Sequence, residues 1–155
     1  ALVISFVPDP AKAVAEMVRV ARPGGTVASY MWDLSMAGSP LEPIYRAISK
    51  VGSAAPRPRS QAVSTRPAQQ ELWTKAGLQA VETRHMRTEA IFSSVEDYWE
   101  ATAVPVGPQG MVINRLSPEA RERLRDALRH ELTPGPDGRI AVPCVASAVK
   151  GRVPQ

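Results

Sequence analysis

The residues best suited to chemistry lie where an apolar run of the sequence ends in Tyr30-Met31-Trp32-Asp33. If this run is a strand, Tyr30 and Trp32 share one face, while Met31 and Asp33 lie on the other. An aromatic wall with one carboxylate is typical of a pocket for a small organic molecule. We therefore predict Tyr30, Trp32 and Asp33 as substrate-binding residues. The same side chains would also serve as core filling and a helix cap, and this alternative stays open.

The other reactive residue types predict no catalytic constellation. We place His85 on the wet face of a strand and His130 on the outer face of a helix, whereas a general base should stand in a cleft. Both are interpreted as surface histidines. The single cysteine, Cys144, is interpreted as a buried apolar residue, and neither a disulfide nor a metal site is predicted. No G-x-S-x-G or G-x-G-x-x-G turn is present, so catalytic residues stay unassigned.

The elements that must position the strand end occupy the first 33 residues. Residues 1–7 and 26–32 are apolar runs, which we predict as parallel strands covered by helices. Between them, Asp9 predicts a helix N-cap and Pro10 the first helical position. The helix ends before Pro23, which cannot continue it. A right-handed crossover would make the two strands parallel neighbours.

This stretch resembles the middle of a class I S-adenosylmethionine-dependent methyltransferase. In that family the pattern covers the fourth strand, the helix after it and the fifth strand. A looser similarity continues to about Arg152. The resemblance rests on Phe6-Val7-Pro8-Asp9-Pro10, Ala15-Glu16-Met17, Arg22-Pro23-Gly24-Gly25, the strand ending in Trp32-Asp33, and Ala76-Gly77-Leu78 before a sixth strand.

The resemblance implies a three-layer, Rossmann-like α/β fold with a mixed sheet. Four strands would fall in this chain, and the last would lie antiparallel between the fifth and sixth of the family. The cofactor would be S-adenosylmethionine, with Ser5, Phe6 and Val7 as its contacts after the first strand. The family's glycine-rich loop precedes this region. We therefore expect a fragment, truncated at its N-terminus, that binds the cofactor poorly by itself.

The rest of the chain predicts further helices and two strands in a single domain, residues 1–155, with a helical cap at about 34–67. The strand over 79–92 is polar enough to lie at a sheet edge. In the last strand, over 140–149, Pro143 implies a bulge or an edge position. Residues 53–65 are interpreted as a lid or a connector, and residues 103–116 as a loop. Helices are expected to begin near Ser39, Pro67, Ser93 and Ser117.

Composition indicates an ordinary globular chain, with 44% hydrophobic and 22% charged residues. It holds no apolar run near the ~20 residues of a membrane helix and no signal peptide, so we expect a cytoplasmic protein. The net charge of +4 is concentrated in a basic segment, residues 46–66, which has no acidic residue. This segment is either a solvated loop or a surface that attracts an anion or nucleic acid.

These observations predict a methyltransferase, a transferase that moves a methyl group from S-adenosylmethionine to a small molecule. One alternative is a non-catalytic binding or partner module on the same scaffold. Another is a nucleic-acid methyltransferase that uses residues 46–66, ranked lower because Ser5-Phe6-Val7-Pro8 lacks the family's base-methylating signature. An exposed first strand would favour a homodimer. Fold and function alike are predicted to require a parallel pair between residues 1–7 and 26–32.

Overall fold

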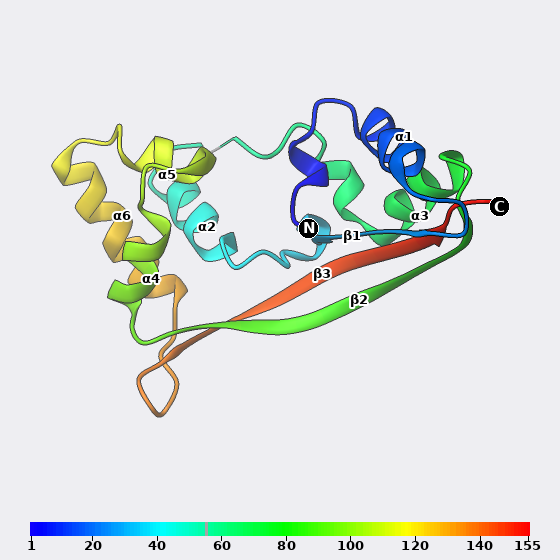
Figure 1. The fold of residues 1–155 in the computed structure, drawn as a ribbon. Helices are drawn as coiled ribbons and strands as arrows, with labels where there is room; N and C mark the ends of the chain where they lie inside the picture. Colours follow the sequence, from blue (N-terminus) through cyan, green and yellow to red (C-terminus); the bar gives the residue numbers. More distant parts are fainter. Residues whose placement is uncertain (55) are drawn as a thin grey trace. The chain divides into compact units, whose positions relative to one another are not determined.

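The computed structural model describes residues 1–54 and 56–155. These residues contain a three-stranded sheet. Its order is β1 (Thr26–Trp32), β3 (Ile140–Arg152), β2 (Gln79–Phe92). β3 pairs antiparallel with β1, from Thr26↔Arg152 to Trp32↔Ala146, and runs opposite to β2 as well (Figure 1). The predicted position of the last strand, antiparallel between two others, is confirmed. Pro143 lies beyond the end of the β1 ladder, so its missing N–H costs no bond there.

The prediction of a strand over residues 1–7 is wrong. The predicted parallel pair with residues 26–32 is therefore not formed, and the described sheet has three strands where four were expected. Ile4–Phe6 form a 3-10 helix instead, and Leu2 has a positive φ of 53°. Between this segment and β1, the Leu2 amide donates to the Tyr30 carbonyl at 2.8 Å. The apolar run reflects burial and not extension, because Ile4 packs in the core against Val27 and Met31. The homodimer was predicted to form through an exposed strand at residues 1–7, and these residues do not form a strand.

The described residues divide into two compact units. Unit 1 comprises Ala1–Ser39, Pro58–Thr88 and Cys144–Gln155, and unit 2 comprises Pro40–Arg57 and Glu89–Pro143. The predicted cap, about 34–67, contributes to both units and does not form one of its own. The single domain stays a prediction.

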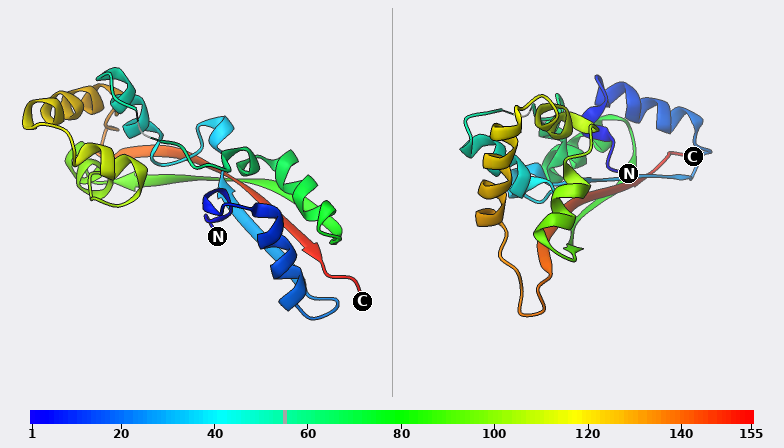
Figure 2. Two further views of the ribbon diagram at one scale, coloured as in Figure 1. Left: turned by 90° about the horizontal axis from the view of Figure 1, so that it is seen from above. Right: turned by 90° about the vertical axis from the view of Figure 1, so that its left-hand side faces the viewer.

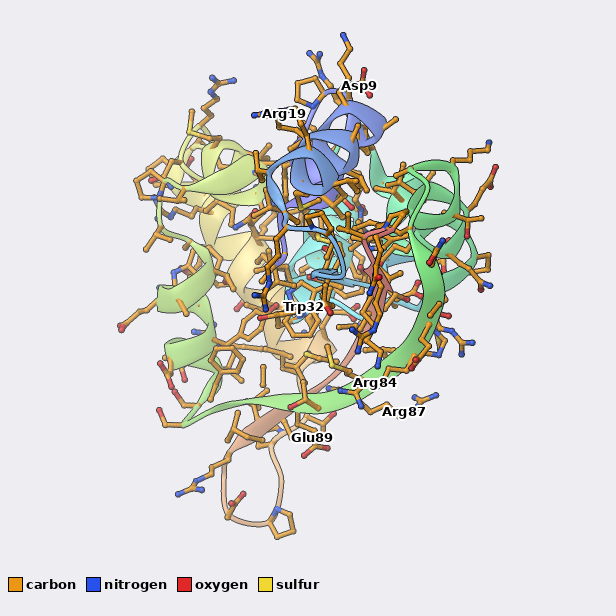
Figure 3. The ribbon with its side chains drawn as sticks, turned by 45° about the vertical axis from the view of Figure 1, so that its right-hand side comes forward. Asp9, Arg19, Trp32, Arg84, Arg87 and Glu89 are labelled. Carbon is orange, nitrogen blue, oxygen red and sulfur yellow. The ribbon has the colours of Figure 1, made fainter. Side chains whose placement is uncertain are left out.

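Unit 1 is a sheet with helices on one face. α1 (Pro10–Val20) begins as predicted, since the Asp9 carboxylate accepts from the Lys12 amide at 3.0 Å. α3 (Arg66–Lys75) lies on the same face, and its buried Trp73 donates from Nε1 to the Val27 carbonyl at 3.1 Å (Figures 1 and 2). Asp9 and Arg19 lie on the outer side of α1 (Figure 3). On the other face of β1, Thr26, Ala28 and Tyr30 are exposed, so the predicted covering of both faces by helices is not found in the described residues.

Unit 2 is a helical core. α2 (Glu42–Lys50) begins later than Ser39 predicted, and α4 (Val95–Thr102) is capped by Ser94. α6 (Pro118–Glu131) buries Leu124 and Leu128 completely, as its four-residue spacing predicted. α5 (Gly107–Ile113) was interpreted as a loop, and this was wrong: Pro108 stands in its first turn, where proline is favourable. None of the described helices has the length and apolarity needed to cross a membrane.

Candidate functional site

The candidate site in unit 1 is built on a buried carboxylate at the end of β1. Asp33 is 2% exposed, and its Oδ1 accepts from the Ser35 amide at 3.1 Å and the Ser35 hydroxyl at 2.6 Å. Its Oδ2 accepts from the Ser147 hydroxyl of β3 at 2.7 Å. The position of Ser147 follows from the register, because this residue stands opposite Met31, two residues before Asp33. Both carboxylate oxygens are thus held in one orientation.

The hydrogen bonds decide the ionisation of Asp33. Burial by itself raises the pKa of a carboxyl group, because the charged form loses water. The bonds donated by Ser35 and Ser147, together with the charge that His85 can carry, outweigh burial and hold the pKa of Asp33 below its usual value of 3.8. Asp33 is therefore a fixed negative charge at neutral pH.

His85 is the partner of this carboxylate. Its Nε2 lies 3.4 Å from Asp33 Oδ2, and its side chain is 27% exposed, so the ring touches both the carboxylate and the solvent side. His85 was interpreted as a surface histidine; its side chain is partly exposed, and it also lies within ion-pair distance of Asp33. His130 is exposed as expected, with Nδ1 at 2.7 Å from the Asp126 carbonyl oxygen. Nothing in the local sequence around residue 85 signals Asp33, because only the sheet order brings β2 and the end of β1 together.

A cavity of about 460 Å³ opens beside this pair. The end of β1, the start of α3 and β2 line it, and its volume suits a small organic molecule. Arg66, at the first position of α3, brings a positive charge to the cavity. No described carboxylate lies within ion-pair distance of Arg66, and its Nε is buried without a hydrogen-bond partner. The lining residues are Asp33, Ser35, Met36, Thr65, Arg66, Pro67, Gln70, Thr83 and His85.

Among the described residues, no group of three His, Cys, Asp or Glu side chains could hold a metal ion. Asp33 and His85 instead form a pair of titratable side chains within ion-pair distance of each other. Cys144, interpreted as a buried apolar residue, is 1% exposed and forms no disulfide.

The structure separates the three predicted substrate residues. Asp33 lines the cavity beside His85, whereas Tyr30, 39% exposed, lines a second hollow of about 500 Å³ over the open sheet face. Arg84 of β2 also lines that second hollow, and Figure 3 labels it together with Trp32. Trp32 is not among the lining residues of either hollow. The expected single wall of two aromatic rings and a carboxylate is not formed in the described residues.

The predicted cofactor contacts do not share a surface. Ser5 is completely buried, and its hydroxyl has no hydrogen-bond partner, whereas Phe6 is 55% exposed. Val7 is half-buried, and its carbonyl accepts from the Ser60 hydroxyl at 3.1 Å. A buried serine next to an exposed phenylalanine does not form a binding surface for S-adenosylmethionine. The three predicted residues therefore do not form a common binding surface for this cofactor.

The basic segment, residues 46–66, is largely paired within unit 2. Glu131 receives Arg46 Nε at 2.8 Å and Lys50 Nζ at 2.5 Å, and these hydrogen bonds lower the pKa of Glu131. Arg57 pairs with Glu42 at 3.0 Å and stacks over the Tyr45 ring. These acids precede or follow the segment in sequence, so the segment is less positive in the fold than it is in the sequence.

The comparisons with known proteins identify no family. No family model matches the chain, and no curated protein matches it. Among solved structures, the chain is similar to a provisionally assigned methyltransferase from Bacillus halodurans, with 13% identity and a TM-score of 0.47. The alignment covers 99% of this chain and 62% of that protein. The chain thus spans less than two thirds of the length of that protein.

Proposed function

We propose that this chain is the acceptor-binding part of an S-adenosylmethionine-dependent methyltransferase that acts on a small molecule. One observation carries the proposal: the order β1-β3-β2, with the last strand antiparallel in the middle. The resemblance of the sequence to class I methyltransferases implied this arrangement. A strand that enters between two earlier ones is a specific feature, because sequential strands are more often neighbours.

The proposal no longer rests on the first strand. The parallel pair that the sequence interpretation required is absent, and the predicted cofactor residues do not line one surface. S-adenosylmethionine would therefore have to be held mainly by residues outside this chain. The contribution of the chain is then limited to the acceptor, at the cavity beyond the end of β1.

At that cavity, the pair Asp33–His85 has the geometry of a proton acceptor. The Ser35 and Ser147 hydroxyls hold the carboxylate, and its Oδ2 lies 3.4 Å from the imidazole Nε2 of His85. A neutral His85 can take a proton from an acceptor hydroxyl, amine or thiol as the acceptor becomes nucleophilic. Positioned general bases contribute about 10²–10⁴-fold to a rate.

The experiment compares this chain with the complete gene product that contains it. We expect calorimetry to detect no micromolar binding of S-adenosylmethionine to the chain alone, and methyl transfer to small acceptors by the complete product. His85→Gln should lower that rate by about 10²–10⁴-fold, while the matched exposed change His130→Gln should not. A complete product that neither binds S-adenosylmethionine nor transfers a methyl group would refute the proposal.

A non-catalytic binding module is the second candidate. The burial of Ser5 and the missing first strand favour it, because both remove parts that cofactor binding was expected to use. It would be supported if the complete product binds small molecules at Asp33–His85 without binding S-adenosylmethionine. The nucleic-acid alternative gains no such observation, since Glu131 and Glu42 pair with three cations of the basic segment.

A further inference from the structure

We propose that the cavity beside Asp33 and His85 takes a small hydroxy acid, with its carboxylate on Arg66 and its hydroxyl directed to His85. The inference deepens the proposed function, on which it rests for the chemical fate of the acid. Binding itself depends only on residues of unit 1. It can therefore be tested apart from methyl transfer.

The charges of the cavity leave one cation uncompensated. The charge of Asp33 is already shared among two serine hydroxyls, an amide and His85. Arg66 has no described carboxylate within ion-pair distance, and its Nε is buried with no hydrogen-bond partner. Because Arg66 lines the cavity, the terminal nitrogens of its guanidinium can bind a ligand carboxylate with two parallel bonds. The cavity therefore favours an anion at Arg66.

The position of Arg66 in α3 supports the same ligand. It stands at the first position of this ten-residue helix, where the helix dipole favours negative charge. Gln70, which also lines the cavity, lies one turn later on the same side. Its amide can donate to a second oxygen of the ligand. Two donors from one rigid helix suit a planar carboxylate.

The remaining walls fix the size and polarity of the ligand. Met36 and Pro67 add apolar surface, and the volume of about 460 Å³ falls in the range of small-molecule sites. His85 and Thr83 are the hydrogen-bonding groups on the β2 side of the cavity, and Asp33 Oδ2 lies 3.4 Å from His85 Nε2. A compact ring or short chain with a carboxylate and a nearby hydroxyl satisfies Arg66 and His85 together. Salicylate has this chemistry and serves as a probe.

The test titrates salicylate, its neutral analogue salicylamide, and benzoate, which lacks the hydroxyl, into the protein. Amide chemical shifts report both the affinity and the position of binding. We expect salicylate to shift residues that line the cavity and to bind about tenfold or more tightly than salicylamide. Arg66→Gln should remove this preference, whereas Arg59→Gln, an exposed arginine of the same segment, should keep it. His85→Gln should remove the preference for salicylate over benzoate and keep that over salicylamide.

Three results would overturn the inference: equal binding of salicylate and salicylamide by the unaltered protein, unchanged salicylate affinity in Arg66→Gln, or shifts confined to residues outside the cavity. The comparison with salicylamide needs no substitution, so an unstable variant does not prevent the test. Binding through Arg66 without methyl transfer by the complete product would refute the proposed function alone. Methyl transfer without preference for the acid would refute the inference alone.

Discussion

Unit 1 and unit 2 bury their polar groups in different ways. Among the described residues, the buried side-chain nitrogen and oxygen atoms without a hydrogen-bond partner all lie in unit 1. They are Ser5 Oγ, Arg66 Nε and Gln69 Oε1. In unit 2, the Tyr98 hydroxyl donates to the Pro40 carbonyl at 2.8 Å, and Thr102 donates to the Tyr98 carbonyl at 2.8 Å. The buried Gln109 of unit 2 donates from Nε2 to the Val106 carbonyl at 3.3 Å, and the hydrophobic core of this unit is aliphatic and aromatic.

Under the proposed function, this contrast separates a ligand-binding region, unit 1, from a stabilising one, unit 2. Each unpaired buried polar group costs about 1–3 kcal/mol, so a fold keeps such groups at a cost to its stability. In unit 1, Arg66 lines the cavity that Asp33 and His85 share. We therefore expect changes in unit 1 to alter ligand binding and changes in the core of unit 2 to alter stability alone. The following predictions test this distinction.

Trp73→Ala should have the largest effect, a loss of about 3–5 kcal/mol. Trp73 is fully buried in unit 1, and its Nε1 bond to the Val27 carbonyl joins α3 to β1. Urea unfolding measures the loss, and salicylate titration should show weaker binding because α3 carries Arg66. Leu128→Ala is the matched change in unit 2, where we expect about 2–5 kcal/mol without a change in salicylate affinity. Equal effects of both variants on binding would contradict the distinction.

Asp33→Ala should destabilise the protein by about 2–4 kcal/mol, because it leaves the Ser35 and Ser147 donors without their charged acceptor. Asp33→Asn should cost less, since its amide oxygen still accepts. Glu100→Gln, an exposed carboxylate in unit 2, is the control and should change stability by less than about 0.5 kcal/mol. Thermal and urea unfolding give these values. An unchanged stability in Asp33→Ala would show that the hydrogen bonds contribute nothing net.

The pH dependence of stability should be smaller but specific to the same residue. The folded pKa of Asp33 is lower than its usual 3.8, so folding favours the ionised form. The stabilisation is complete above the unfolded pKa and is lost as pH falls through the lower folded pKa. Other carboxylates, including Asp97 and Glu131, also have lowered pKa values, so the difference between the unaltered protein and Asp33→Asn isolates this contribution. Parallel acid-unfolding curves below pH 4 would contradict it.

Tyr98→Phe should have the smallest effect, about 1–2 kcal/mol. It removes the donor to the Pro40 carbonyl and the acceptor of the Ile44 amide, 3.3 Å away, but keeps the ring that packs edge-on against Phe92. Urea unfolding should show the loss, with no change in salicylate affinity. A change in affinity without a change in stability would place ligand chemistry in unit 2 and reverse the distinction.

Local patterns in the sequence predict most elements well. The helix after Asp9, the strands over 26–32 and 79–92, and the helix after Ser117 follow from caps, prolines and apolar spacing, which act within a few residues. The same patterns failed for residues 1–7, because an apolar run indicates burial and does not distinguish a strand from a tight turn. They also failed for α5, where glycine and proline suggested a loop although both stand in its first turn.

The sequence by itself determined the helix caps, the apolar faces and the strand that ends in Asp33, because these depend on neighbouring residues and on the exclusion of water. Only the tertiary structure decided that Asp33 meets Ser147 and His85, residues 114 and 52 positions away, and that Tyr30 faces a different hollow. Pairing between distant strands sets those distances. No local periodicity encodes which strand will lie in the middle of a sheet.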